Sequence, residues 1–273
     1  MLRFLIALMM LVMPLTASAQ SQSLSIDGDH GKLSAVLQTP DAQAKYPLVI
    51  ICHGFTADKN HPLLKSLSDE LEARGIASIR FDFNGHGDSD GDFQAMTVLN
   101  EIEDAQKVYE YASALPNVKS ISIAGHSQGG VVASMVAGQL GSKKIKAVVL
   151  MAPAAVLRDD ALRGNLFGAH YNAANPPDYV EINNHGLRRV GRDYILTAQV
   201  LPIYETAERF TGAALMIHGK GDVVVPYTYS LSYKKIYKRG EVELLDGVDH
   251  SFTGNQKRTA KLAADFFARQ LNK

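Results

Sequence analysis

The sequence has 273 residues but only one cysteine, Cys52, and no tryptophan. A single cysteine excludes an internal disulfide framework. Its position within the apolar stretch PLVIICHG also excludes a lipid-modified cysteine at a leader junction. The sequence also has no excess of positive or negative charge, because 28 basic residues balance 28 acidic ones. Without such a bias, neither nucleic acid nor an anionic membrane surface is indicated as a partner.

A long hydrophobic run is also missing. The apolar segment from Phe4 to Leu15 is twelve residues long, whereas a membrane-spanning helix needs about 20. Arg3 precedes this segment and the small residues Ala17 and Ala19 follow it, which is the pattern of a cleaved secretory leader. We therefore expect residues 1–19 to be a signal peptide. The remaining chain, 20–273, is then secreted or periplasmic and has no membrane anchor.

Internal repeats and low-complexity linkers are absent too, so residues 20–273 are expected to form one catalytic domain. Short β-branched runs alternate with helical periodicity, a pattern typical of parallel strands joined by crossover helices. The segments SQSLSIDG and KLSAVLQTP resemble an antiparallel edge pair, and YPLVIICHG a fully buried strand. Further strands are expected at IASIRFDF, SISIAGHS, IKAVVLMAP, AALMIHG and EVELLDG. About seven or eight strands then share one sheet.

One interval is too long for a simple connection. About 55 residues separate VVLMAP from AALMIHG, where a loop normally takes far fewer. Its middle, YVEINNHGLRRV, reads as a small hairpin that turns at Asn184, His185 and Gly186. We expect residues 154–208 to form a cap over the carboxyl edge of the sheet.

A serine lies between glycines at the point where an expected strand gives way to an expected helix. Gly125-His126-Ser127-Gln128-Gly129 fits the pattern G-x-S-x-G in the strand–turn–helix context that makes this motif specific. The tight turn exposes the hydroxyl of Ser127 at the amino end of the helix. There the amide of Gln128 can stabilise the negative charge that acyl transfer develops.

A serine nucleophile needs a base, and the base needs an orienting carboxylate. Asp222 follows the expected strand AALMIHG, and His250 follows the last expected strand. Both residues therefore lie at the carboxyl edge of the sheet, where Ser127 also lies. Asp246 and Asp249 are alternative carboxylates, but they are so near His250 in the chain that Asp222 is preferred.

The second oxyanion donor is expected after the first buried strand, where the segment HGFT places the amide of Phe55. Three other histidines, His53, His126 and His218, are expected to order loops by hydrogen bonds. None of the nine histidines has the close His/Glu spacing of a zinc helix, so no metal is expected.

The stretch IRFDFNGHGDSDG places charged side chains on a glycine-rich turn. They include Arg80, Asp82 and His86. Buried charges are usually paired, so a structural ion pair that shapes this turn is preferred over a catalytic role.

Several motifs together resemble the α/β-hydrolases and, within them, the bacterial cinnamoyl (feruloyl) esterases. They are HGFT, FDFNGHGDSDG, IAGHSQGG, MAPAAVLRDDALRGN, LPIYE, HGKGDVVVP and GVDHSF. The resemblance covers essentially all of residues 20–273, and the cap motifs are its most specific part. It implies an α/β-hydrolase fold, with a mostly parallel central sheet flanked by helices and an inserted cap (lid) subdomain.

The resemblance also implies two substrate contacts in the cap. In the family, an aspartate and a tyrosine contact the phenolic end of a hydroxycinnamoyl group, and by motif these fall on Asp160 and Tyr194. A glutamine that some members carry in the cap is replaced here by Phe167. The simpler alternative is that Asp160 caps a short helix beginning at DALRG and that Tyr194 packs in the core of the cap.

The sequence therefore predicts a secreted serine carboxylesterase that cleaves hydroxycinnamate esters, including plant cell-wall feruloyl saccharides, without a cofactor. Ser127, His250 and Asp222 are the expected triad, with the amides of Phe55 and Gln128 as the oxyanion hole. The nearer alternative is a general short-chain carboxylesterase, peptidase or thioesterase, because the fold does not fix the leaving group. The more distant one is a non-catalytic ligand-binding protein.

Overall fold

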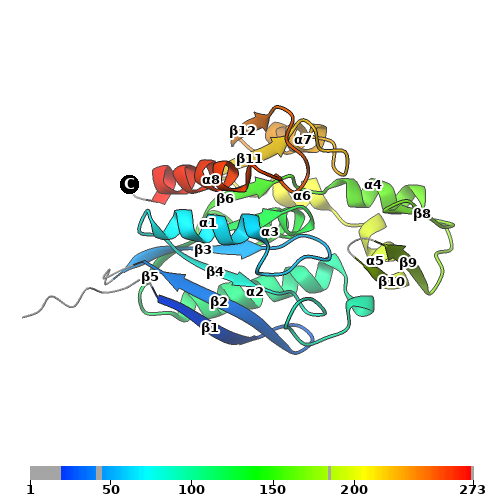
Figure 1. The fold of residues 1–273 in the computed structure, drawn as a ribbon, viewed down its shortest axis with the longest axis horizontal. Coiled ribbons are helices and arrows are strands. Elements are labelled where there is room, and N and C mark those ends of the chain that lie inside the picture. Colours follow the sequence, from blue (N-terminus) through cyan, green and yellow to red (C-terminus); the bar gives the residue numbers. More distant parts are fainter. Residues whose placement is uncertain (1–19, 41–44, 184–185, 272–273) are drawn as a thin grey trace, which may run out of the picture.

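An eight-stranded sheet forms the centre of the protein, which we describe from a computed structural model covering residues 20–40, 45–183 and 186–271 (Figure 1). The expected leader, residues 1–19, lies outside the described residues. The strand order is β1-β2-β4-β3-β5-β6-β11-β12. The strands are β1 (Gln20–Asp27), β2 (Lys32–Thr39), β3 (Tyr46–Cys52), β4 (Ala77–Phe81), β5 (Val118–His126), β6 (Ile145–Met151), β11 (Ala213–Gly219) and β12 (Arg239–Leu245).

The sheet is mostly parallel, as predicted. β1 pairs with β2 and β2 with β4 in antiparallel register, and these pairings form one edge of the sheet. All pairings from β4 through β3, β5, β6 and β11 to β12 are parallel. The carboxyl ends of these strands therefore meet at one edge, where loops can converge.

Helices cover both faces of the sheet because successive side chains of each strand point to opposite faces. In β3, Ile50 and Cys52 join one hydrophobic cluster, while Val49 and Ile51 join the other. The second cluster is closed by α1 (Pro62–Glu72) and α8 (Gln256–Leu271), and the first by α2 (Val98–Ala114), α3 (Gln128–Leu140) and α7 (Thr228–Ile236). A short 3-10 helix, η1 (Phe93–Ala95), precedes α2.

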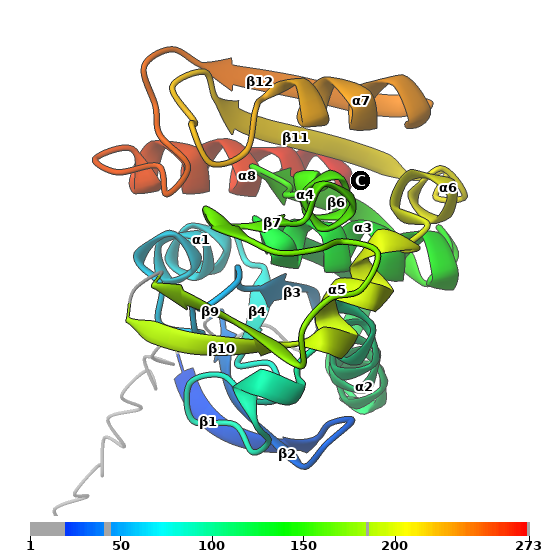
Figure 2. The ribbon, with the colours of Figure 1, turned by 90° about the vertical axis from the view of Figure 1, so that its right-hand side faces the viewer.

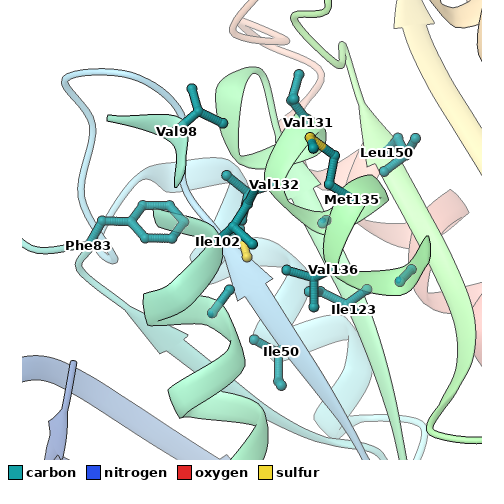
Figure 3. Packing of buried hydrophobic residues seen from close by; sticks show 14 of the residues in the cluster. Ile50, Phe83, Val98, Ile102, Ile123, Val131, Val132, Met135, Val136 and Leu150 are labelled. Carbon is teal, nitrogen blue, oxygen red and sulfur yellow. The ribbon is translucent and has the colours of Figure 1, made fainter. Parts of the chain in front are cut away.

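Helix α2 is anchored at its start and along its apolar face. Thr97 is the N-cap residue, and its hydroxyl accepts a hydrogen bond from the amide of Asn100 at 3.1 Å. Ile102, in the first part of α2, packs with Val132 of α3 in the first cluster (Figure 3). This packing brings the first turns of α2 close to the residue that follows Ser127.

The residues between β6 and β11 form small elements, most of which lie at the carboxyl ends of the parallel strands, whereas α6 packs against α3 (Figures 1 and 2). They are α4 (Val156–Arg163), β7 (Asn165–Leu166), β8 (Ala169–His170), β9 (Tyr179–Asn183), β10 (Leu187–Gly191), α5 (Arg192–Gln199) and α6 (Ile203–Ala207). β9 and β10 pair as an antiparallel hairpin, while the expected turn residues Asn184 and His185 lie outside the described residues. Across the described part of the chain, every helix is too short or too polar to cross a membrane.

Candidate active site

Ser127 occupies a strained turn between β5 and α3. Its φ of 55° and ψ of −122° are unusual for a residue with a side chain, and such strain is concentrated at functional sites. The turn tolerates no side chain at the two flanking glycines. A Cβ at Gly125 would lie 1.9 Å from the carbonyl oxygen of Gly129, and a Cβ at Gly129 would lie 2.2 Å from that of His53. Glycine at both positions is thus what allows the turn to form.

The structure brings together the three residues predicted as a triad, from the ends of β5, β11 and β12. Nε2 of His250 lies 2.9 Å from Oγ of Ser127, and Nδ1 lies 2.7 Å from Oδ2 of Asp222. The carboxylate is fully buried, while the imidazole is partly accessible. In this arrangement Nδ1 can donate to the carboxylate, which leaves Nε2 free to accept the proton of the serine hydroxyl.

A fourth residue, His218, supports the carboxylate from the other side. Its Nε2 lies 3.1 Å from Oδ2 of Asp222 and 2.9 Å from the carbonyl oxygen of Val225. Both neighbours are acceptors, so Nε2 carries the proton, and Nδ1 accepts from the Ser230 hydroxyl at 2.7 Å. The prediction that His218 orders a loop is confirmed, but its contact with Asp222 was not predicted.

Asp222 is held as an anion. Burial alone would raise the pKa of its carboxyl, but hydrogen bonds from His218, His250 and the amide of Val225 hold that pKa well below its usual range. Oδ1 also accepts the amides of Val224 and Val225, at 2.9 and 2.8 Å. The carboxylate therefore keeps a fixed orientation and charge.

The two alternative carboxylates are engaged elsewhere. Asp246 is exposed and pairs with Lys220 at 2.7 Å. Oδ1 of Asp249 accepts the amide of Thr253 at 2.7 Å. Within the described residues, only Asp222 forms a hydrogen bond to the His250 ring through a carboxylate.

The predicted oxyanion donors flank Ser127. Phe55 and Gln128 line one cavity together with Ser127. Among the described residues, the amides of Phe55 and Gln128 donate to no protein acceptor, so both are available to a ligand. Two such N–H groups beside the nucleophile are what an oxyanion hole requires.

The loop carrying Phe55 is ordered by His53, as predicted. Nδ1 of His53 donates to the carbonyl oxygen of Gly54 at 2.8 Å, and Nε2 accepts the amide of Phe83 at 3.1 Å. Burial lowers the pKa of His53 to about 4, so the ring is neutral. His126 has a similar role, because its Nε2 bonds the carbonyl oxygen of His250 at 2.9 Å.

The predicted ion pair in the glycine-rich turn exists, but its cation comes from another loop. Nζ of Lys59 lies 2.6 Å from Oδ2 of Asp82, and both side chains are buried. Arg80 instead donates to the carbonyl oxygen of Lys59 at 2.6 Å. The ring of His86 lies near that of His53, with centroids 5.0 Å apart and the two planes tilted by 58°. The cluster therefore ties the loop after β3 to the turn after β4.

Two cavities open at Ser127. A cavity of about 450 Å³, which we call the loop-side cavity, is lined by polar residues that include Asp58, Asn60 and His61. A second one of about 400 Å³, the cap-side cavity, is lined mainly by apolar residues that include Leu157 and Leu166. The two cavities meet beside the nucleophile, and polar residues are more numerous in the lining of the loop-side cavity.

Both predicted cap contacts, Asp160 and Tyr194, line the cap-side cavity. The helix-capping alternative for Asp160 is wrong, because α4 begins at Val156 and Asp160 lies inside the helix. Tyr194 is buried, yet its hydroxyl donates to Oε1 of Gln128 at 2.8 Å. Burial raises the pKa of both Asp160 and Tyr194.

Phe167, at the position where some family members carry glutamine, separates the two cavities and lines both. Its ring stacks on that of Phe55, with centroids 5.1 Å apart and an angle of 19° between the planes. A flat aromatic surface therefore takes the place of a polar side chain at this position.

Glu101 is a buried polar residue that the sequence did not single out. Its Oε2 accepts a hydrogen bond from Nε2 of Gln128 at 2.9 Å. Burial, opposed by this hydrogen bond and assisted by the charge of Asp104, raises the pKa of Glu101 to about 8. In the described part of the chain, no three His, Cys, Asp or Glu side chains are grouped to hold a metal ion.

A serine, a histidine and a buried aspartate at the carboxyl edge of a mostly parallel sheet define a serine hydrolase. Comparisons with known proteins agree. Residues 43–175 match the family described as serine aminopeptidase, S33. The structure of Est1E from Butyrivibrio proteoclasticus with ferulic acid bound is 31% identical in sequence, with a TM-score of 0.87 over 92% of this chain and 100% of that chain.

More distant relatives match only in part. An uncharacterised 31.7 kDa protein of Escherichia coli is 29% identical over 43% of this chain and 41% of its own length. Human protein ABHD12B is 28% identical over 70% of this chain and 49% of its own length. The chain thus spans half or less of these curated relatives. It belongs to the α/β-hydrolase superfamily and has cinnamoyl-esterase-like relatives.

Proposed function

We propose that this serine hydrolase is a carboxylesterase that cleaves esters of hydroxycinnamic acids such as ferulate, coumarate and caffeate. The observation that carries the proposal is the cap-side cavity, which has apolar walls, opens at Ser127 and is lined by Asp160 and Tyr194. A hydroxycinnamoyl group is flat and mostly apolar with a phenol at its far end, so it suits an apolar slot with a few polar groups. That Est1E has been solved with ferulic acid bound supports the same reading.

The proposed reaction uses an acyl-enzyme. His250 takes the proton of the Ser127 hydroxyl while Oγ attacks the ester carbonyl, and the amides of Phe55 and Gln128 hold the oxyanion. The alcohol leaves with the proton from His250. Water, deprotonated by the same histidine, then attacks the acyl-serine, and the hydroxycinnamic acid and free Ser127 are released. Asp222 keeps the imidazole oriented in both halves.

The two cavities suggest which part of the ester binds where. The acyl group occupies the cap-side cavity, and the alcohol occupies the loop-side cavity beside Asp58, Asn60 and His61. These polar side chains could bond an alcohol that carries further hydroxyl groups, such as a sugar. We also propose that the enzyme acts outside the cytoplasm. That proposal rests on the sequence of residues 1–19 alone.

A substrate panel tests the function. Methyl ferulate and methyl caffeate are compared with methyl butyrate, a short acyl thioester and an aminoacyl 4-nitroanilide. We expect kcat/KM for the hydroxycinnamate esters to exceed that for the butyrate ester by at least about tenfold, because only they fill the cap-side cavity. A preference for the butyrate ester would favour a general esterase, and turnover of the anilide alone would favour a peptidase.

A labelling experiment addresses the non-catalytic alternative. A fluorophosphonate probe reacts covalently with an activated serine, so intact-protein mass spectrometry should show one adduct, located on Ser127 by peptide mapping. Absence of the adduct in folded protein would favour a ligand-binding protein.

A further inference from the structure

A chain of hydrogen bonds runs from the core of the protein to the wall of the cap-side cavity. Glu101, in the first turn of α2, accepts from Nε2 of Gln128 at 2.9 Å, and Oε1 of Gln128 accepts from the hydroxyl of Tyr194 at 2.8 Å. Glu101, Gln128 and Tyr194 are all buried, and the last two line the cavity. The three side chains come from α2, α3 and α5, which are far apart in the sequence.

The order of donors and acceptors along this chain is set at its buried end. A carboxyl group keeps an acceptor oxygen in either protonation state, whereas the amide of Gln128 has one donor end and one acceptor end. Nε2 of Gln128 faces Oε2 of Glu101 and also, at 3.7 Å, the Met96 sulfur, which can only accept a hydrogen bond. The NH₂ group therefore lies on the buried side, and the carbonyl oxygen faces Tyr194. The single proton of the Tyr194 hydroxyl is then committed to Gln128.

A hydroxyl whose proton is committed can only accept further hydrogen bonds. In the cap-side cavity, Tyr194 would thus accept from a ligand hydroxyl but could not donate to a ligand ether oxygen. Asp160, the other predicted contact in this cavity, is a carboxyl residue and also an acceptor when ionised. A ligand must therefore bring a hydrogen-bond donor to the polar end of the cavity.

We propose that Glu101 is a positioning residue that acts through Gln128 to make the Tyr194 hydroxyl an acceptor, so that the cavity selects acyl rings with a free phenolic hydroxyl. The inference rests on the proposed hydroxycinnamate specificity. It adds a prediction that does not follow from the shape of the cavity. The enzyme should distinguish an acyl ring with a free phenol from the same ring with a methyl ether.

The test compares methyl ferulate with methyl 3,4-dimethoxycinnamate, in which a methyl group replaces the phenolic hydrogen. For the wild-type enzyme we expect kcat/KM to favour methyl ferulate by roughly tenfold, mainly through KM, because an unmatched buried acceptor is costly. Glu101→Met removes the acceptor and leaves an apolar side chain of similar length. Gln128 can then turn, the Tyr194 proton is released, and the preference should fall below about threefold.

Glu103→Met provides the matched control. Glu103 lies on the same helix but is exposed, with Lys107 as its partner at 3.7 Å. This variant should keep the full wild-type preference. Thermal unfolding reports whether each variant is folded. If Glu101→Met does not fold, Gln128→Met breaks the same chain of hydrogen bonds and is judged by the same ratio.

The outcomes separate the two proposals. A full preference for methyl ferulate in folded Glu101→Met overturns the role of Glu101 and leaves the proposed function standing. An equal loss on both esters, with the ratio unchanged, also overturns it, because that pattern indicates a general structural role. A wild-type enzyme that hydrolyses neither ester overturns both proposals, whereas one that hydrolyses both esters equally well overturns only the role of Glu101.

Discussion

Nδ1 of His250 lies 2.7 Å from Oδ2 of Asp222, and the same oxygen is held at 3.1 Å by Nε2 of His218. The buried carboxylate therefore receives hydrogen bonds from two imidazoles. Because both donors favour its ionised form, its pKa stays low despite burial. The residue that orients the proposed base is thus itself oriented by a histidine outside the triad.

Asp222→Asn should lower kcat by about 10⁴, the loss known when a triad aspartate is replaced by its amide. The amide cannot hold His250 in the tautomer that leaves Nε2 free to take the Ser127 proton. Steady-state hydrolysis of methyl ferulate measures the effect. Asp249→Asn is the control and should remain near wild type. A large loss in Asp249→Asn with little loss in Asp222→Asn would assign the orienting role to Asp249.

His218→Leu should lower kcat by about 10- to 100-fold with little change in KM, since it removes one charge-assisted hydrogen bond from Asp222. Ser230→Ala, which removes only the outer partner of His218, should have a smaller effect. Comparison of kcat and KM for the two variants checks this order. A loss confined to KM would show that His218 shapes the binding site rather than the triad.

Asp160→Asn and Tyr194→Phe should weaken the hydrolysis of ferulate and caffeate esters by about 1 to 3 kcal/mol in kcat/KM. Only substrates with a phenol use these groups, so turnover of a short acyl ester should barely change. The two substrates are measured side by side for each variant. Equal losses on both would point to a role in folding, and no loss on either would remove these residues from the binding site.

The buried carboxyl of Glu101 should make stability depend on pH. Burial and the charge of Asp104 outweigh the opposing Gln128 hydrogen bond and raise its pKa from 4.5 to about 8. Between these values the unfolded chain has released the proton while the folded chain still holds it. The unfolded state thus binds fewer protons, and stability falls as pH rises through this window.

Glu101→Gln removes that titration, so its free energy of unfolding should fall less between pH 5 and pH 8 than that of the wild type. Urea unfolding at three pH values in this range gives the difference in free energy of unfolding between the two proteins. The contributions of other titrating groups largely cancel in this difference. Parallel pH curves would show that Glu101 does not titrate in the window.

Most of the fold could be predicted from the sequence because the signals are local. The central strands β3, β6 and β11 are short apolar runs, and the helix α3 begins at Gln128, where the motif G-x-S-x-G places it. The triad could also be predicted, since parallel strands bring their carboxyl ends to one edge. Ser127, Asp222 and His250 each follow such an end.

The supporting residues could not be predicted, because their partners are distant in sequence and their own surroundings carry no signal. Lys59 reads as an ordinary loop lysine until β4 brings Asp82 beside it. Glu101 reads as a polar residue on an amphipathic helix, and only the packing of α2 against α3 buries it below Gln128. The alternative role of Asp160 as a helix-capping residue was wrong for the same reason. Where α4 begins depends on its packing within the cap subdomain, which the local sequence does not show.

The most direct measurement is the release of ferulate from methyl ferulate by the wild-type protein and by Ser127→Ala, under identical conditions. Triad residues act as a unit, so the alanine variant should lose on the order of a millionfold in kcat while its thermal unfolding stays close to wild type. Hydrolysis by the wild type together with this loss is the predicted result. A Ser127→Ala enzyme that keeps more than about a tenth of the wild-type rate would contradict it.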